Sequence, residues 1–529
     1  MSDVLDSESG GIVLTARHKT QSVLSIWWCN FFSAKLCVPL RLGDLYVLRF
    51  LLPQRRGGTQ SFAENSVSFG HSLLILGFSA AFICLTSIEG RAQAQTRVKI
   101  TVTSPETVVV QAHLFSPSRL WSFRNAHAGV LGIAERIDRF RANGVYVRMI
   151  AMGEFRSSGD ATEIDYVVHM RRPSPADVAH VSWLNEDHGF LMFADLLPQG
   201  MEAVSLELSV PRGWTIHSAI APDTDGLYQV SHPDDAIFFL GRSIRSTSKK
   251  ELDALITGTW RFKDSVAVKA ATRLMERYLE LTAFKLPSRP AVMIAPLPVA
   301  TGSTKWRAQT RGSTVLLLMD PQAQITNWKG QLEIIFAHEV LHLWVPNALT
   351  LRGDYDWFFE GFTLYTALLT ALDVKAIDFR EYLDTLARVY DSYISYPNVL
   401  SLIEASERRW THPWPVVYDK GMLVAFLFDL VLRKESGGKT TLLSRYRELF
   451  SPGKADRADG NDVIIGLLSS SPEAADLAAA YISGKKDLEL DRYLASYGLI
   501  LDTSGKSSRL IPGTKVDDDQ KRLLKSLGY

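Results

Sequence analysis

The residues most able to do chemistry in this 529-residue chain lie at positions 338–342, which read His-Glu-Val-Leu-His. On an α-helix, residues i and i+4 share one face, so His338 and His342 can direct two imidazole nitrogens at one metal ion. Glu339 lies between them in sequence and can reach the same cleft. The neighbouring residues of 334–343 are mostly apolar, which predicts a helix buried on most sides. Polar groups on such a helix are costly unless they are paired or bound to a metal.

A further carboxylate supports a metal site. Glu360 lies near the start of a second predicted apolar helix, in the run Trp-Phe-Phe-Glu-Gly-Phe-Thr. Catalytic zinc sites typically use three protein ligands, and two histidines with one glutamate form a recurring set. The sequence therefore predicts one Zn²⁺ per chain, bound by His338, His342 and Glu360, with Glu339 as the general base. The alternative is a buried helix whose histidines are ordinary core residues.

Composition favours a globular protein of two to four domains, with 46% hydrophobic and 22% charged residues. The 58 basic and 57 acidic residues leave a formal net charge of +1, and there is no long basic run. This balance argues against nucleic acid or a membrane surface as a partner.

The N-terminal region contains an apolar run at residues 72–85, followed by Ala-Gln-Ala at 92–94. The run is short for a membrane span, and the pair resembles the core and cleavage site of a secretory signal peptide. We expect cleavage after Ala94, a true start near Val67, and export to a bacterial-type periplasm or medium. The alternative is that the extension is real and residues 72–88 anchor the protein in a membrane.

Cysteine usage agrees with this division. Cys29, Cys37 and Cys84 all precede the predicted cleavage point, and no cysteine follows Ala94. The exported part would therefore need no disulfide and could not use a thiol nucleophile.

Hydrophobic periodicity predicts an α+β multidomain protein. Alternating segments separated by turn residues predict an N-terminal antiparallel β-sandwich, and later segments predict a catalytic domain of strands and helices and then a helical domain. The expected divisions are an extension with signal peptide (1–94), the β-sandwich (95–250), the catalytic domain (251–375), the helical domain (376–502) and a polar C-terminal tail with one short helix (503–529).

Tyr418 is a candidate for a further catalytic role. It lies in the run Val-Tyr-Asp-Lys-Gly, directly before a strongly apolar predicted helix. Peptide hydrolysis builds negative charge on the carbonyl oxygen, and a positioned phenol can stabilise that charge. The alternative is an interfacial tyrosine that caps a core helix.

Three segments, HEVLHLW, WFFEGFTLY and VYDKG, together resemble the glycyl aminopeptidase family of gluzincin (thermolysin-like) zinc metallopeptidases. They are more distantly similar to the aminopeptidase N group, which shares the zinc set and a tyrosine before a Lys-Gly pair. The likeness covers residues 97–500 and implies a thermolysin-like catalytic domain. It also implies the roles of the site residues, with zinc bound by His338, His342 and Glu360, Glu339 as the base and Tyr418 as the oxyanion stabiliser.

One departure from that family concerns the strand that edges the cleft. Where members often carry a Gly-Leu-Glu-His type of sequence, this chain has Arg-Ala-Gln-Thr at 307–310. Gln309 then replaces a carboxylate, and its amide can accept a hydrogen bond from a free amine but offers no full charge. We expect Gln309 to contact substrate, with specificity for a free N-terminus left open.

The predicted function is a zinc-dependent metallopeptidase, an aminopeptidase by this resemblance, that acts on a peptide or protein substrate. The alternatives are a non-catalytic secreted binding protein that keeps the fold, and a zinc hydrolase of a non-peptide substrate.

Overall fold

The computed structural model describes residues 95–127, 130–175, 177–299, 306–322, 332–397, 399–409, 416–451 and 458–529. The predicted signal peptide or anchor and the three cysteines lie outside these residues. Residues Thr96–Tyr529 belong to one compact unit. Across the described ranges, no helix combines the length and the apolar character needed to cross a membrane.

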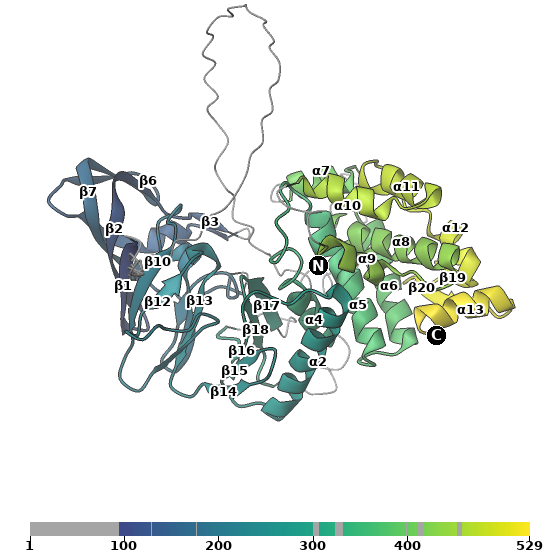
Figure 1. Cartoon of the computed structure of the whole chain (residues 1–529), viewed down its shortest axis with the longest axis horizontal. Coiled ribbons are helices and arrows are strands. Elements are labelled where there is room, and N and C mark those ends of the chain that lie inside the picture. The colour runs from purple at the N-terminus through teal and green to yellow at the C-terminus, as the bar shows by residue number, and fades with distance from the viewer. Residues whose placement is uncertain are drawn as a thin grey trace, which may run out of the picture. The chain divides into compact units, whose positions relative to one another are not determined.

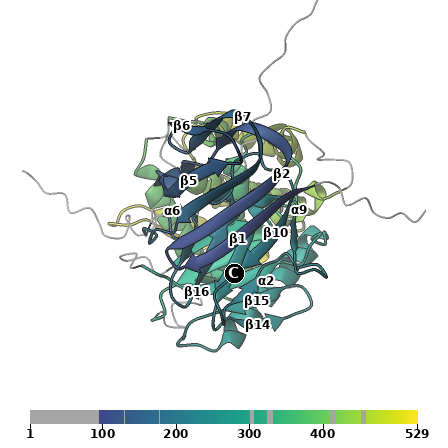
Figure 2. The ribbon, with the colours of Figure 1, turned by 90° about the vertical axis from the view of Figure 1, so that its left-hand side faces the viewer.

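The first part of the described chain contains two larger β-sheets (Figures 1 and 2) and a short pair of strands, β3 (Ala126–His127) with β4 (Val130–Leu131). A seven-stranded sheet has the order β12-β10-β1-β2-β7-β5 with β6 paired to β7, and a four-stranded sheet has the order β11-β13-β9-β8. The strands of the larger sheet are β1 (Thr96–Ser104), β2 (Thr107–Ser122), β5 (Ile137–Ala142), β6 (Val147–Ala151), β7 (Glu154–His169), β10 (Val204–Ser209) and β12 (Tyr228–Val230). Those of the smaller sheet are β8 (Trp183–Leu184), β9 (His188–Met192), β11 (Thr215–His217) and β13 (Ile237–Gly241).

These two sheets share one apolar core, because the inward-facing side chains of both sheets pack against each other. Val98 and Ile100 of β1 belong to the same buried cluster as Phe238 and Leu240 of β13. The pairing departs from a fully antiparallel sandwich at one place, because β1 and β10 are parallel. Parallel neighbours need a long connection, and the whole of β2 to β9 separates these two strands in sequence.

A mixed five-stranded sheet follows, in the order β14-β15-β16-β18-β17. Its strands are β14 (Arg245–Ser248), β15 (Asp253–Ile256), β16 (Ala291–Pro296), β17 (Trp306–Arg311) and β18 (Thr314–Met319). Both faces are buried: Val292 packs in the cluster of the following helices, whereas Met293 packs with Phe190 and Phe239 of the four-stranded sheet. A sheet covered on both faces explains why β16 and β18 read as unbroken apolar runs. The sheet also begins before residue 251, where the catalytic domain was expected to start.

Helices make up most of the remaining described chain (Figure 1). The helical elements are α2 (Asp264–Thr282), α4 (Glu333–Leu341), η5 (Trp357–Phe362), α5 (Thr363–Asp373), α6 (Phe379–Ile394), α7 (Leu402–Glu407), η6 (Val416–Lys420), α8 (Gly421–Ser436), α9 (Leu442–Leu449), α10 (Gly460–Leu468), α11 (Pro472–Leu477), η7 (Ala478–Ile482), α12 (Leu490–Leu494), η8 (Ala495–Tyr497) and α13 (Asp518–Leu527). His338 lies in α4 and His342 is the residue that caps its C-terminus, whereas Glu360 lies in η5, which continues into α5.

The C-terminal residues, expected as a polar tail with one short helix, contain that helix, α13, and also a strand that pairs with the preceding residues. Strand β20 (Arg509–Pro512) pairs with β19 (Leu499–Asp502), so this hairpin crosses the expected boundary at residue 502. Helix α13 buries Leu523, Leu524 and Leu527 in the main helical core. These leucines occupy one face of an otherwise charged helix, and that apolar face drives the packing.

Candidate metal centre

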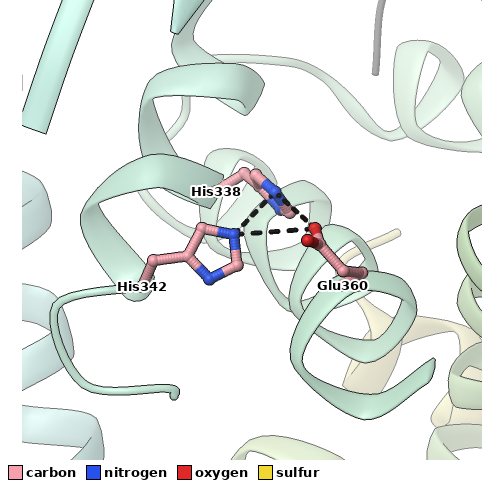
Figure 3. Close-up of side chains that lie close together, drawn as sticks. All are labelled: His338, His342 and Glu360. Carbon is pink, nitrogen blue, oxygen red and sulfur yellow. Dashed lines mark hydrogen bonds and ion pairs between the residues drawn. The ribbon is translucent and has the colours of Figure 1, made fainter. Parts of the chain in front are cut away.

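Helix α4 is held in the core and presents both histidines to one point (Figure 3). The hydroxyl of Tyr278 in α2 donates a hydrogen bond of 2.9 Å to the carbonyl oxygen of Ala337, immediately before the first histidine. His338 Nε2 and His342 Nε2 lie 2.9 Å apart. Glu360 Oε2 lies 3.4 Å from the first of these nitrogens and 3.8 Å from the second. The structure thus brings together the three residues that the spacing predicted as ligands.

Both imidazoles are in the state that binds a metal. His342 Nδ1 lies 2.8 Å from the carbonyl oxygen of Val345, which accepts its proton and leaves the Nε2 lone pair facing His338 and Glu360. Burial lowers the pKa of each histidine to about 3, and the positive charge of Arg409 adds to this decrease. Protons therefore do not compete for these nitrogens near neutral pH.

Glu360 and Tyr418 lie in two π-helical turns, η5 and η6, that approach each other very closely. A Cβ atom added at Gly361 would lie 2.6 Å from Gly421 Cα and 2.6 Å from the carbonyl oxygen of Val417. Only a glycine permits this approach of two backbones. The two turns thereby place a predicted ligand and the predicted oxyanion donor beside each other, and π-helical turns of this kind often occur at functional sites.

Glu339 is oriented by the edge strand of the five-stranded sheet. The hydroxyl of Thr310 in β17 lies 2.8 Å from Glu339 Oε2 and 2.7 Å from the main-chain oxygen of the same residue. Within the described chain, Glu339 Oε1 is buried and has no hydrogen-bond partner. Burial raises the pKa of this carboxyl to about 8, the hydrogen bond from Thr310 opposes the increase, and the charge of Glu360 adds to it.

Besides Thr310, sequence reasoning missed two residues of the site, Arg409 and Asp356. The Nη2 atom of Arg409 lies 2.6 Å from Glu360 Oε1 and 2.7 Å from the hydroxyl oxygen of Tyr418, and its Nη1 donates to Asp356. Arg409 has an exposed fraction of only 5%. The sequence offers only a polar segment, Ser-Glu-Arg-Arg, for Arg409 and an acid before an apolar run for Asp356. Neither pattern has a spacing that indicates chemistry.

The donors fit a divalent cation such as zinc. Nitrogen from two imidazoles and oxygen from one carboxylate is a typical zinc set. Glu360 Oε2 is buried with no hydrogen bond among the described residues, although it faces both imidazoles.

Gln309 is the one predicted site residue that the structure does not bring to this group. Its side chain is fully buried, and with the amide oriented to satisfy its partners it bonds to His180, the carbonyl oxygen of Ala179 and Arg311. Adjacent residues of a strand point to opposite faces, and Thr310 is the residue whose side chain contacts Glu339.

No family model matches the chain, and no curated protein matches it. Solved structures do. A crystal structure of an aminopeptidase N family protein from Idiomarina loihiensis matches at a TM-score of 0.63 and 18% identity, covering 80% of this chain and 82% of that one. An M1 zinc metallopeptidase from Deinococcus radiodurans matches at a TM-score of 0.48 and 13% identity, covering 75% of this chain and 95% of that one. A mutant of that enzyme bound to a Tyr-Ser-Ala substrate matches at 0.47 and 13%, covering 74% and 94%. The first of these likenesses shows that this chain has the fold of an aminopeptidase N family protein.

Proposed function

We propose that this protein is a zinc-dependent metallopeptidase that hydrolyses peptide bonds in a peptide or protein substrate. One observation carries the proposal: two neutral imidazole nitrogens converge with Glu360 Oε2, which has no hydrogen bond among the described residues, beside the oriented carboxylate of Glu339. His338, His342 and Glu360 would hold one Zn²⁺. Zinc at this position would supply Lewis acidity to activate water and polarise a peptide carbonyl at neutral pH.

Glu339 is the general base of the proposed reaction. Thr310 occupies its Oε2, whereas Oε1 has no partner in the described residues and can accept a proton. We propose that this oxygen takes a proton from the attacking water and delivers it to the nitrogen of the leaving amine. The bond between water oxygen and carbonyl carbon forms, and the bond between carbonyl carbon and amide nitrogen breaks.

Tyr418 is the proposed donor to the developing oxyanion. It is buried in η6, within hydrogen-bonding distance of Arg409, which in turn bonds to Glu360. A side chain that served only to cap a core helix would not require this connection to the predicted ligands. A phenol fixed beside the reaction centre can stabilise negative charge without reorganisation at the moment of reaction.

Two narrower parts of the proposal, aminopeptidase specificity and export, rest on the sequence alone. Aminopeptidase specificity follows from the resemblance of three motifs, and export to the periplasm or medium follows from the run at residues 72–85 and the Ala-Gln-Ala at 92–94. N-terminal sequencing of the protein recovered from its source tests export. A chain that begins at Gln95 supports cleavage, whereas an intact N-terminus in a membrane fraction supports the anchor.

Metal content and peptide cleavage together test the activity. We expect about one zinc per chain and chelator-sensitive cleavage, and Glu339→Gln should keep the zinc and lose turnover. Aminoacyl substrates and internally quenched peptides distinguish removal of N-terminal residues from internal cleavage. Zinc binding without cleavage of either kind of substrate would contradict the proposed peptidase activity and favour a binding protein or a hydrolase of a non-peptide substrate. Absence of zinc would contradict the metal centre itself.

A further inference from the structure

One nitrogen of Arg409 contacts both the predicted metal ligand Glu360 and the predicted oxyanion donor Tyr418. We propose that Arg409 is a positioning residue that fixes the carboxylate of Glu360 and the phenol of Tyr418 in one arrangement. The part concerning Tyr418 rests on the proposed peptidase function. The part concerning Glu360 requires only that the site binds a metal.

The two oxygens of Glu360 have different surroundings. Oε2 faces the imidazoles of His338 and His342, whereas Oε1 accepts a hydrogen bond of 2.6 Å from Arg409 Nη2. The guanidinium therefore occupies one oxygen and leaves the other directed at the histidines. Hydrogen bonds of this kind to a ligand carboxylate fix its orientation, and their loss usually weakens metal binding.

The same nitrogen orients Tyr418. A guanidinium Nη atom carries two protons, so Arg409 Nη2 can donate one to Glu360 and one to the Tyr418 oxygen, at 2.7 Å. Because the phenol oxygen accepts from a cation that has no acceptor of its own, the phenol proton must point elsewhere. Glu360 bonds to the same Arg409 nitrogen, so the three side chains form a triangle in which Arg409 contacts both of the others. A substrate oxyanion can take over the phenol proton while Arg409 keeps the phenol oxygen in place.

Arg409 is itself held rigidly. Its Nη1 donates to Asp356, and its guanidinium carbon lies 5.8 Å from the ring centre of Phe359 and 5.7 Å from that of Tyr418. A planar fork can bond to partners on both of its branches, whereas the single nitrogen of a lysine cannot reproduce this geometry. A positive charge alone would therefore not replace it.

The chain offers a matched control. Arg433 in α8 is also 5% exposed and bonds to a buried acid, Asp429, at 2.8 Å. Among the described residues it bonds to Asp429 and to the carbonyl oxygen of Ser526, and not to the histidines or Glu360. Replacing it removes a buried arginine and its ion pair without touching the proposed triangle.

The first test measures zinc affinity in the full chain by competition with a chelating indicator. We expect Arg409→Lys and Arg409→Met to weaken zinc binding by roughly 10- to 100-fold and Arg433→Met to leave it unchanged. Unchanged or tighter binding in the Arg409 variants would overturn the proposal, since the guanidinium would then only repel the cation. If Arg409→Met does not fold, Arg409→Met with Asp356→Asn removes the buried charge that is left without a partner, and the same comparison applies.

The second test measures kcat in a double-mutant cycle with Tyr418→Phe on a zinc-saturated peptide-hydrolysis assay. Arg409→Lys should lower kcat by roughly tenfold or more in the wild-type background and by much less when Tyr418 lacks its hydroxyl. Equal losses in both backgrounds would overturn the link to Tyr418. A wild-type protein that binds zinc but cleaves no peptide would contradict the proposed function, and the affinity test would still decide whether Arg409 positions Glu360.

Discussion

Thr310 Oγ1 lies 2.8 Å from Glu339 Oε2 and 2.7 Å from the main-chain oxygen of Glu339. Through this hydroxyl, the edge strand β17 is tied to helix α4 at the residue proposed as the base. The hydroxyl has a single proton for two acceptors of the same residue, so it keeps the carboxylate folded toward its own helix. The second carboxylate oxygen is left available for the proposed proton transfer.

Removing this hydroxyl should slow the reaction without releasing the metal. Thr310→Val keeps the shape of the side chain, and a hydrogen bond to a charged group contributes about 1.5 kcal/mol or more. We therefore expect kcat to fall by roughly tenfold or more, with zinc content unchanged, whereas Thr310→Ser should retain most activity. Steady-state kinetics and metal analysis of both variants measure this. Equal activities of the valine and serine variants would show that the contact does not orient Glu339.

A side chain at Gly361 should disrupt the contact between the two π-helical turns. The added Cβ of Gly361→Ala would lie 2.6 Å from two backbone atoms, and overpacking of this kind costs about 1–3 kcal/mol. Zinc affinity should fall together with the free energy of unfolding, because Glu360 is the preceding residue. Gly466→Ala in α10 is the control, since its Cβ would meet nothing within 4 Å and alanine favours a helix. Urea titrations that show equal stability for the two variants would argue against the close approach.

The stability of the helical region should depend on Asp419. This carboxyl is buried, accepts a hydrogen bond of 2.6 Å from Ser392, and burial raises its pKa to about 7. The unfolded chain releases this proton near pH 4, whereas the folded protein retains it to about pH 7. The unfolded state therefore binds fewer protons across this window, so the contribution of Asp419 to the free energy of unfolding falls as pH rises.

Asp419→Asn cannot ionise and should lack this dependence. When the pH is raised from about 4.5 to about 7.5, we expect the free energy of unfolding of the wild type to fall by a few kcal/mol relative to that of the variant. Urea titrations at the two pH values measure the change. A difference between the two proteins that stays constant with pH would show that Asp419 titrates near its usual value.

The packing of the C-terminal helix is directly testable. Leu524 in α13 is fully buried, so Leu524→Ala should lower the free energy of unfolding by about 2–5 kcal/mol. Ile511→Ala in the neighbouring strand β20 removes a side chain that is 41% exposed and should cost much less. Thermal and urea unfolding of the two variants make the comparison. Equal, small effects would mean that residues 503–529 are a separate tail after all.

The sequence by itself was enough to predict the proposed ligand set and the proposed base. His338, Glu339 and His342 were readable because a helix repeats every 3.6 residues, a local property that spacing reveals. Glu360 was readable as a lone acid in an apolar run. The alternating strands before residue 250 and most helices that follow were also predictable from local sequence. Each of these elements buries one face, and the spacing of its apolar residues shows which face that is.

Tertiary structure decided what surrounds these residues. Thr310 and Arg409 reach the site from other elements, β17 and the segment after α7, and no local pattern encodes such contacts. Gln309 shows the reason most clearly. Side chains alternate along a strand, so a shift of one residue decided whether Gln309 or Thr310 faced Glu339. Only the pairing of β17 with β18 and the packing of α4 against it settle that register, because they are set by contacts between segments far apart in the chain.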